Sequence, residues 1–235
     1  MLKATNIHKH YNELPILKGI DITINTKEVV CITGPSGAGK TTLLQILGTL
    51  DQADEGEVMI DGININQLKG KKLAKFRNNK LGFIFQFHQL LPEFTAVENV
   101  IIPALLGGKS KVESIDKAKK TLDYLGLSHR LDHKPAQLSG GEQQRVAVAR
   151  AMINDPAIIF ADEPSGNLDS KNSNELHQLF FELKEEHNQT FVIVTHNQEL
   201  ANMADRKLVM KDGVILPEMS NQNTSNLNNH LVEEE

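Results

Sequence analysis

The chain has 235 residues and a mass of 26.1 kDa, with 40% hydrophobic residues, 23% charged residues and a mean hydropathy of −0.31. These values predict a soluble protein with one large domain, or a core with an insertion. The net charge of −5 argues against nucleic acid or an anionic membrane surface as the main partner. A single cysteine excludes an internal disulfide, and no apolar run suits a signal peptide or a membrane span. Attachment to a membrane would therefore need another subunit.

Apolar runs predict strands in the first third of the chain. The run GIDITIN at residues 19–25 alternates isoleucine with polar residues, as expected for a half-buried strand. The run EVMIDGI at residues 57–63 contains Asp61-Gly62, a hairpin signal. Between them, VVCIT at residues 29–33 is continuously apolar, which is typical of a strand covered on both faces.

Two later apolar runs, AIIFAD at residues 157–162 and FVIVT at residues 191–195, have the same character as VVCIT. Helix-like segments separate them, so we predict an α/β fold with a parallel sheet and crossover helices. From about Phe87 to Gln137 the chain becomes polar with apolar residues at helical spacing, which predicts a helical insertion. After Pro217 the composition is rich in Asn and Ser and predicts a disordered tail at residues 217–235.

The sequence GPSGAGKT at residues 34–41 fits the pattern G-x-x-x-x-G-K-[ST] of a phosphate loop. Small residues are needed there because backbone N–H groups must wrap around phosphate oxygens. We expect Lys40 to reach the β- and γ-phosphates and the Thr41 hydroxyl to bind Mg²⁺. The loop stands between a buried strand and a helix whose positive end faces the nucleotide, so a chance glycine-rich turn is the weaker interpretation. The predicted nucleotide-binding residues are Gly34, Pro35, Ser36, Gly37, Ala38, Gly39, Lys40, Thr41 and Thr42.

Two acids end the strand-like run IIFAD. Asp162 is placed to hold Mg²⁺, and Glu163 is placed to accept a proton from the attacking water. An acidic pair after a strand is commonly a solvated loop, but the phosphate loop upstream favours the functional interpretation. Gln86 and His196 also follow strand-like runs, at the sheet edge where ligands collect. Their spacing alone assigns neither of them a role.

A second glycine pair stands in LSGGEQQ at residues 138–144. Ser139 and Glu142 have the spacing of a capping box, which explains these two residues as a helix start. It does not explain Gly140 and Gly141 in the first turn, where glycine costs stability. Bare N–H groups at a helix N-terminus suit a phosphate. Because the phosphate loop already serves the chain's own nucleotide, we expect a second copy, turned head to tail, to receive this end.

Taken together, these segments resemble the motifs of an ABC-type ATPase subunit over roughly residues 1–216. GPSGAGKT is similar to Walker A, LSGGEQQ to the signature, IIFADE to Walker B and SGNLD to the D-loop. The resemblance implies ATP and Mg²⁺ as cofactors. It also implies a phosphate-loop NTPase core with an N-terminal antiparallel β subdomain and a helical subdomain inserted at about residues 87–145.

The same resemblance implies further residue roles. Tyr11 stands where the family stacks an aromatic ring on adenine, and His196 is the switch histidine that contacts the γ-phosphate. Gln86 is the Q-loop glutamine, which senses Mg²⁺ and the membrane subunit. The signature residues Ser139, Gly140 and Gly141 bind the ATP of the other copy in a homodimer, and Asp169 joins the two sites.

Two stretches indicate a branch of the family: FQFHQLLPEFTAVENV at residues 85–100 and ADEPSGNLDS at residues 161–170. They are similar to the ATPases of lipoprotein-releasing systems and, more broadly, to macrolide-exporter and cell-division relatives. The first stretch lies where the family docks a coupling helix of the membrane subunit. Mild departures are GEQQR, where many relatives have arginine or lysine after the glutamate, and Ser165, where threonine is common. The resemblance implies release of lipoproteins, powered from the cytoplasmic face of the inner membrane, with membrane contact only through a permease.

Three alternatives stay open at this point. A related drug or peptide exporter, or a cell-division complex, would keep the enzyme and change the cargo. A DNA-repair-type ABC ATPase would carry long coiled coils, zinc modules or tandem cassettes, whereas Gln86 to Leu138 leaves room only for a compact insertion. A nucleotide-binding regulator without hydrolysis is disfavoured by Glu163.

Overall fold

The structure, a computed structural model, describes residues 1–217, so the expected tail lies outside the described residues apart from Pro217. The strands are β1 (Leu2–Tyr11), β2 (Leu14–Ile24), β3 (Val29–Thr33), β4 (Glu55–Ile60), β5 (Ile63–Asn64), β6 (Leu81–Phe85), β7 (Ile158–Asp162), β8 (Thr190–Val194), β9 (Arg206–Lys211) and β10 (Val214–Ile215). The α-helices are α1 (Lys40–Leu47), α2 (Gly70–Lys80), α3 (Ala96–Leu106), α4 (Lys111–Tyr124), α5 (Gly140–Met152), α6 (Ser170–His187) and α7 (Gln198–Met203). Within residues 1–217, no helix has both the length and the apolarity to cross a bilayer.

The predicted parallel sheet is confirmed. Its strand order is β10–β9–β3–β8–β7–β6, and all neighbours are parallel except β10 and β9. Alternate residues of β3 enter two different hydrophobic clusters: Val29 and Cys31 pack towards α3–α7, whereas Val30 and Ile32 pack towards α1 and the N-terminal strands. Because successive side chains of a strand point to opposite faces, a strand covered on both faces must be apolar throughout.

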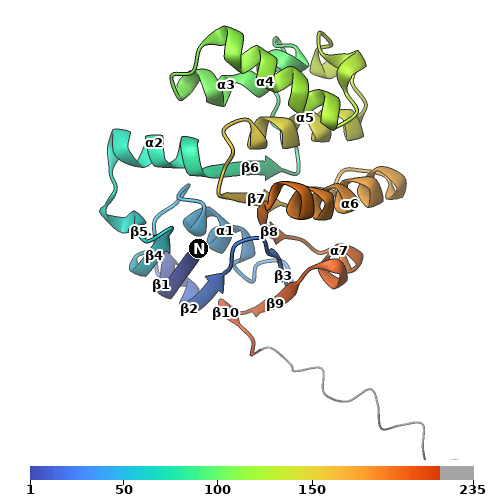
Figure 1. Ribbon diagram of the computed structural model, residues 1–235. Helices are drawn as coiled ribbons and strands as arrows, with labels where there is room; N and C mark the ends of the chain where they lie inside the picture. Colours follow the sequence, from blue (N-terminus) through green and yellow to red (C-terminus); the bar gives the residue numbers. More distant parts are fainter. Residues whose placement is uncertain (218–235) are drawn as a thin grey trace, which may run out of the picture.

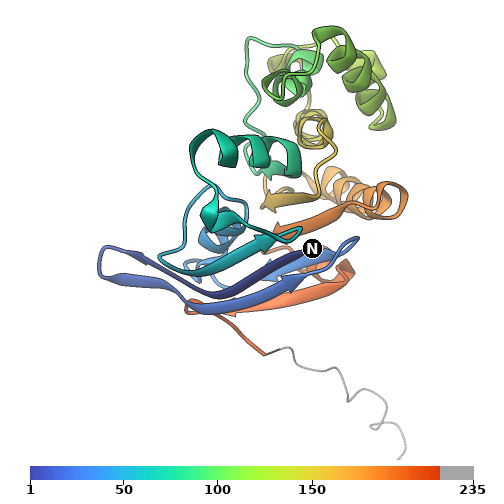
Figure 2. The same cartoon turned by 60° about the vertical axis from the view of Figure 1, so that its left-hand side comes forward.

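A second, antiparallel sheet is formed by the N-terminal strands in the order β2–β1–β4–β5. Figure 2 shows these strands as a separate layer below α1 and α2. Asp61 and Gly62 connect β4 and β5 with φ values of 50° and 75°, as a tight hairpin turn requires, so the hairpin prediction is confirmed. The Lys18 N–H donates to the Gly213 carbonyl at 3.0 Å and ties β2 to the turn between β9 and β10.

Helices α3, α4 and α5 lie together above the sheets in Figure 1, between β6 and β7 in the chain. Each begins with a capping box, in which a Ser or Thr hydroxyl and a Glu carboxylate satisfy free backbone N–H groups. Helix α5 continues from these helices onto β6. At Gly82 in β6 an added Cβ would lie 2.7 Å from the Ala151 carbonyl oxygen, so glycine permits the close approach of the helix. The expected subdomain boundary near residue 145 therefore falls inside α5.

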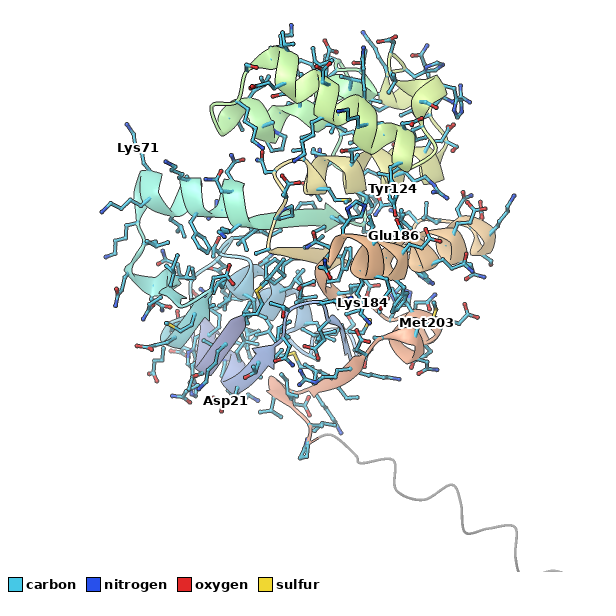
Figure 3. All side chains as sticks on the ribbon, in the orientation of Figure 1. Asp21, Lys71, Tyr124, Lys184, Glu186 and Met203 are labelled. Carbon is cyan, nitrogen blue, oxygen red and sulfur yellow. The ribbon has the colours of Figure 1, made fainter. Side chains whose placement is uncertain are left out.

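The Tyr124 side chain joins α4 to α6. The Tyr124 hydroxyl at the end of α4 donates to Glu186 Oε2 at 2.8 Å, and Figure 3 shows the two side chains side by side. The Tyr124 ring also meets the His187 ring edge-on, with centroids 5.1 Å apart. Burial, and then the neighbouring Glu186 carboxylate, raise the pKa of Tyr124 to about 12. The hydroxyl therefore stays protonated and donating across the physiological range.

Candidate functional site

The phosphate loop runs from the end of β3 to the start of α1, and its glycines meet two different demands. At Gly34, φ is 145° and an added Cβ would lie 2.0 Å from the Met210 carbonyl oxygen, so no side chain fits. At Gly37, φ is 79° and an added Cβ would meet no heavy atom within 4 Å. The loop is thus packed closely on β9 at one glycine and open at the other, which leaves backbone N–H groups accessible.

A cavity of about 480 Å³ lies beside this loop. It is lined by Gly34, Ser36, Gly37, Gly39, Lys40, Thr41 and Thr42 of the loop, and by Ile16, Glu163, Val194 and His196. The Lys40 ammonium lies across the loop, donating to the Gly34 and Pro35 carbonyls, both at 2.9 Å. Pro35 and Ala38 belong to the loop without lining the cavity. The cavity therefore brings most of the predicted phosphate-binding residues together with the acid and the histidine that follow β7 and β8.

Thr41 and Asp162 meet at the edge of the cavity. The Thr41 hydroxyl donates to Asp162 Oδ1 at 3.2 Å. Burial is the largest influence on Asp162 and raises its pKa, the Thr41 hydrogen bond opposes this, and the Glu163 charge adds to it. A carboxylate deprived of water favours a nearby cation, and hydroxyl and carboxylate oxygens are the hard ligands that Mg²⁺ prefers. The residues present therefore fit a Mg²⁺ ion.

Glu163 and His196 form a pair between the ends of β7 and β8. His196 Nδ1 lies 2.8 Å from Glu163 Oε2, and the His196 backbone N–H donates to the same oxygen at 3.2 Å. Glu163 has a φ of 47°, a left-handed conformation that costs a residue with a side chain about 1–3 kcal/mol. Its backbone N–H is fixed on the Val194 carbonyl at 2.9 Å. The Glu163 side chain is 20% exposed, so its carboxylate can reach a water molecule in the cavity.

Gln86 follows β6, beside Asp162, because Phe85 pairs with Asp162 in the parallel ladder. Its side chain does not line the phosphate cavity. Instead Gln86 Nε2 donates to Asn167 Oδ1, and Asn167 Nδ2 donates to the Gln86 carbonyl, both at 3.1 Å. The two amides thus join the loop after β6 to the loop after β7. Asn167 was missed as a partner of Gln86, although it stands inside the SGNLD segment that the sequence singled out.

The capping box predicted at the second glycine pair is present. Ser139 Oγ accepts the Glu142 N–H at 3.2 Å, and the Ser139 N–H donates to Glu142 Oε2 at 2.7 Å. The two glycines differ in their surroundings. An added Cβ at Gly140 would meet only Leu168, at 3.6 Å, whereas one at Gly141 would lie 2.3 Å from Asn172 Oδ1. Gly141 thus has a packing reason that the sequence did not indicate, whereas an added Cβ at Gly140 would make only an ordinary van der Waals contact.

The remaining predicted residues lie outside the phosphate cavity of their own chain. Asp169 caps α6, where the Asn172 N–H donates to it at 2.9 Å and keeps its pKa low. Tyr11 ends β1 with 46% of its surface exposed, and its hydroxyl donates to Asp51 Oδ2 at 3.1 Å. Ser139, Gly140 and Gly141 likewise do not line this cavity. Ile16 and Val194 do line it and were missed, because only the fold brings β2 and β8 beside the loop.

This geometry defines a phosphate-loop NTPase: a glycine-rich loop between a buried strand and a helix, with an acidic pair on a neighbouring strand. The family model for the ABC transporter matches residues 17–166. The chain belongs to the ABC transporter family, in which it is an ATPase subunit that binds nucleotide.

The relatives of the chain are similar over nearly their whole length. The lipoprotein-releasing system ATP-binding protein LolD of Cytophaga hutchinsonii is 60% identical, covering 92% of this chain and 99% of that protein. LolD of Porphyromonas gingivalis is 59% identical, covering 93% of this chain and 100% of that protein. Among solved structures, a dimeric bacterial ABC transporter cassette is 43% identical with a TM-score of 0.84, covering 92% and 97%. A dimeric post-hydrolysis state of that cassette with ADP and Pi is 42% identical with a TM-score of 0.83, with the same coverage.

Proposed function

We propose that this chain is the ATP-hydrolysing subunit of an ABC system that releases lipoproteins from the inner membrane towards the outer membrane. The observation that carries the proposal is the identity of 60% to a lipoprotein-releasing ATPase across 92% of the chain. The stretch FQFHQLLPEFTAVENV at residues 85–100 supports the same branch. In this proposal residues 1–216 are one ATP-binding domain with a helical subdomain at about residues 87–145.

The residues have the following proposed roles, and the cavity lining supports those of Lys40, Thr41, Glu163 and His196. Lys40 and the loop N–H groups bind the phosphates, and Tyr11 receives the adenine. Thr41 and Asp162 hold Mg²⁺, which when bound would supply positive charge to the phosphate oxygens. The Gln86 side chain, whose amide bonds to Asn167 in this structure, would turn away from Asn167 to join them. Glu163 accepts the proton of the attacking water, and His196 keeps that carboxylate in place and contacts the γ-phosphate.

The proposed assembly is a homodimer attached to a membrane-embedded permease at the cytoplasmic face of the inner membrane. Ser139, Gly140 and Gly141 of one copy bind the ATP held by the other, and Asp169 lies between the two sites. The exposed N-terminus of α5, at Ser139 and Gly140, supports this arrangement, as do the dimeric forms of the similar cassette. The permease docks at residues 85–100, where Phe87 is 73% exposed and Phe94 is 41% exposed.

The cargo is tested by purifying the chain with its membrane partner from mild detergent and placing the complex in vesicles that contain a lipoprotein. We expect ATP to release lipoprotein from these vesicles, and the same complex with Lys40→Ala to release none. Retention of the lipoprotein by an ATP-hydrolysing complex, with export of a drug or a peptide instead, would contradict the proposed cargo and leave the ATPase assignment intact.

Lys40→Ala is expected to weaken ATP binding by roughly 10- to 100-fold, because a hydrogen bond to a charged group is worth about 1.5–3 kcal/mol. Titration calorimetry with ATP measures the change. Lys119→Ala is the matched control, since Lys119 is exposed on α4, away from the loop. Equal affinity of the Lys40→Ala variant and the control would contradict the phosphate-loop assignment.

A further inference from the structure

Gln144 is a buried polar residue that the mechanism above does not use. It lies inside α5, one turn after the glycine pair, and its side chain is 0% exposed. Its Nε2 donates to the Pro164 carbonyl at 2.7 Å, and Pro164 directly follows Glu163. Its Oε1 is buried and has no hydrogen-bond partner among the described residues. The side chain therefore makes one short hydrogen bond and leaves its acceptor unused.

This arrangement is unfavourable as a device for stability. A buried acceptor without a donor carries the full penalty of losing its water. A methionine of similar length would fill the same space without that penalty. The hydrogen bond that Gln144 does make points to a carbonyl next to the proposed general base. Packing within α5 therefore does not explain a glutamine at this position. Its hydrogen bond to Pro164, in the segment after β7, does explain it.

The backbone at Glu163 needs such support. Its left-handed conformation, with φ at 47°, is strained and persists only where neighbouring groups hold it. Helix α6 holds Ser165, two residues after Glu163, because His177 Nε2 and the Ser165 hydroxyl lie 3.0 Å apart in a buried contact. Gln144, which belongs to α5, holds Pro164 through its hydrogen bond to the Pro164 carbonyl. Residues 163–165 are thus fixed from two helices, and one of these begins with the glycine pair.

We propose that Gln144 is a positioning residue for Glu163, which couples the N-terminus of α5 to the general base of the same chain. The coupling rests on the proposed function, in which the start of α5 binds the ATP of the other copy. Gln144 lies three residues after Gly141, within the same rigid stretch of helix. A displacement of this end by the partner's nucleotide moves Gln144, and its hydrogen bond passes the movement to Pro164 and Glu163. Closure of one ATP site thereby positions the general base, Glu163, in the other ATP site.

Gln144→Met tests the positioning role, because methionine keeps the length and removes the donor. We expect kcat to fall about 10- to 100-fold, as for a misplaced catalytic group, with KM for ATP unchanged. The midpoint of thermal unfolding should stay close to that of the wild type, because the variant removes one buried acceptor without a donor, Gln144 Oε1, and creates another, the Pro164 carbonyl. Gln178→Met, on the exposed face of α6, is the control and should change none of the three. An unchanged kcat, or a kcat loss that only accompanies a lower unfolding midpoint, would overturn the proposal.

A double-mutant cycle separates this proposal from the proposed function. If Gln144 acts through Glu163, Gln144→Met should cause no further loss of hydrolysis in a Glu163→Gln background. A further tenfold loss there would overturn the positioning role. Wild-type hydrolysis by Glu163→Gln alone would instead remove the catalytic assignment of Glu163. Slow hydrolysis by Glu163→Gln together with wild-type hydrolysis by Gln144→Met would overturn the positioning role of Gln144 and leave the catalytic role of Glu163 intact.

Discussion

Glu163→Gln is expected to bind ATP as the wild type does and to hydrolyse it about 10²- to 10⁴-fold more slowly, the usual contribution of a general base. The amide keeps the length of the side chain, and its oxygen can still accept the His196 backbone N–H that now bonds to Glu163 at 3.2 Å. It cannot take a proton from the attacking water. Phosphate release under saturating ATP measures the loss of turnover, and titration calorimetry measures the retained affinity.

The same variant should accumulate as a dimer on gel filtration in ATP, because the nucleotide that holds the two copies together is not consumed. Glu182→Gln is the matched control, since Glu182 is exposed on α6 and lies outside the cavity. Normal turnover by Glu163→Gln, with no dimer in ATP, would assign the proton transfer to another group.

The parts of the fold that the sequence predicted well are those fixed by local patterns. The continuous apolar runs of β3, β7 and β8 follow from burial on both faces, and each is buried along most or all of its length. The Asp61-Gly62 turn and the capping box at Ser139 are set by residues no more than three positions apart in the chain. The phosphate loop belongs to this group, since its glycines, lysine and threonine are contiguous.

The parts that the sequence did not predict depend on residues far apart in the chain. Asn167 binds Gln86 across 81 positions, and Ile16 lines the cavity only because β2 lies beside the phosphate loop. Gly141 was interpreted as an anion-binding glycine, yet the nearby Asn172 side chain of α6 also requires it. No periodicity or spacing encodes such contacts, because each is created when separate elements pack together.

Ser139→Glu is expected to leave ATP binding by the isolated chain unchanged and to reduce hydrolysis at least about 100-fold. Ser139 does not line its own phosphate cavity, so the chain's own nucleotide does not meet the new carboxylate. In the head-to-tail dimer the carboxylate would face the γ-phosphate held by the other copy, and like charges repel. Ser110→Glu is a close control: Ser110 caps α4 with the same capping box, so both variants lose about 1 kcal/mol of helix capping.

A mixture of the Lys40→Ala and Ser139→Glu variants tests the composite site more directly. A mixed dimer of Lys40→Ala and Ser139→Glu has one site with both defects and one site with neither, because each site takes Lys40 from one copy and Ser139 from the other. At an ATP concentration too low to fill the Lys40→Ala site, turnover should therefore rise when the two are mixed, because every site is impaired in each variant alone. It should also fall faster than the enzyme concentration on dilution, as dimers separate. Full activity of Ser139→Glu alone, together with turnover strictly proportional to enzyme at high dilution, would mean that one copy completes its own site.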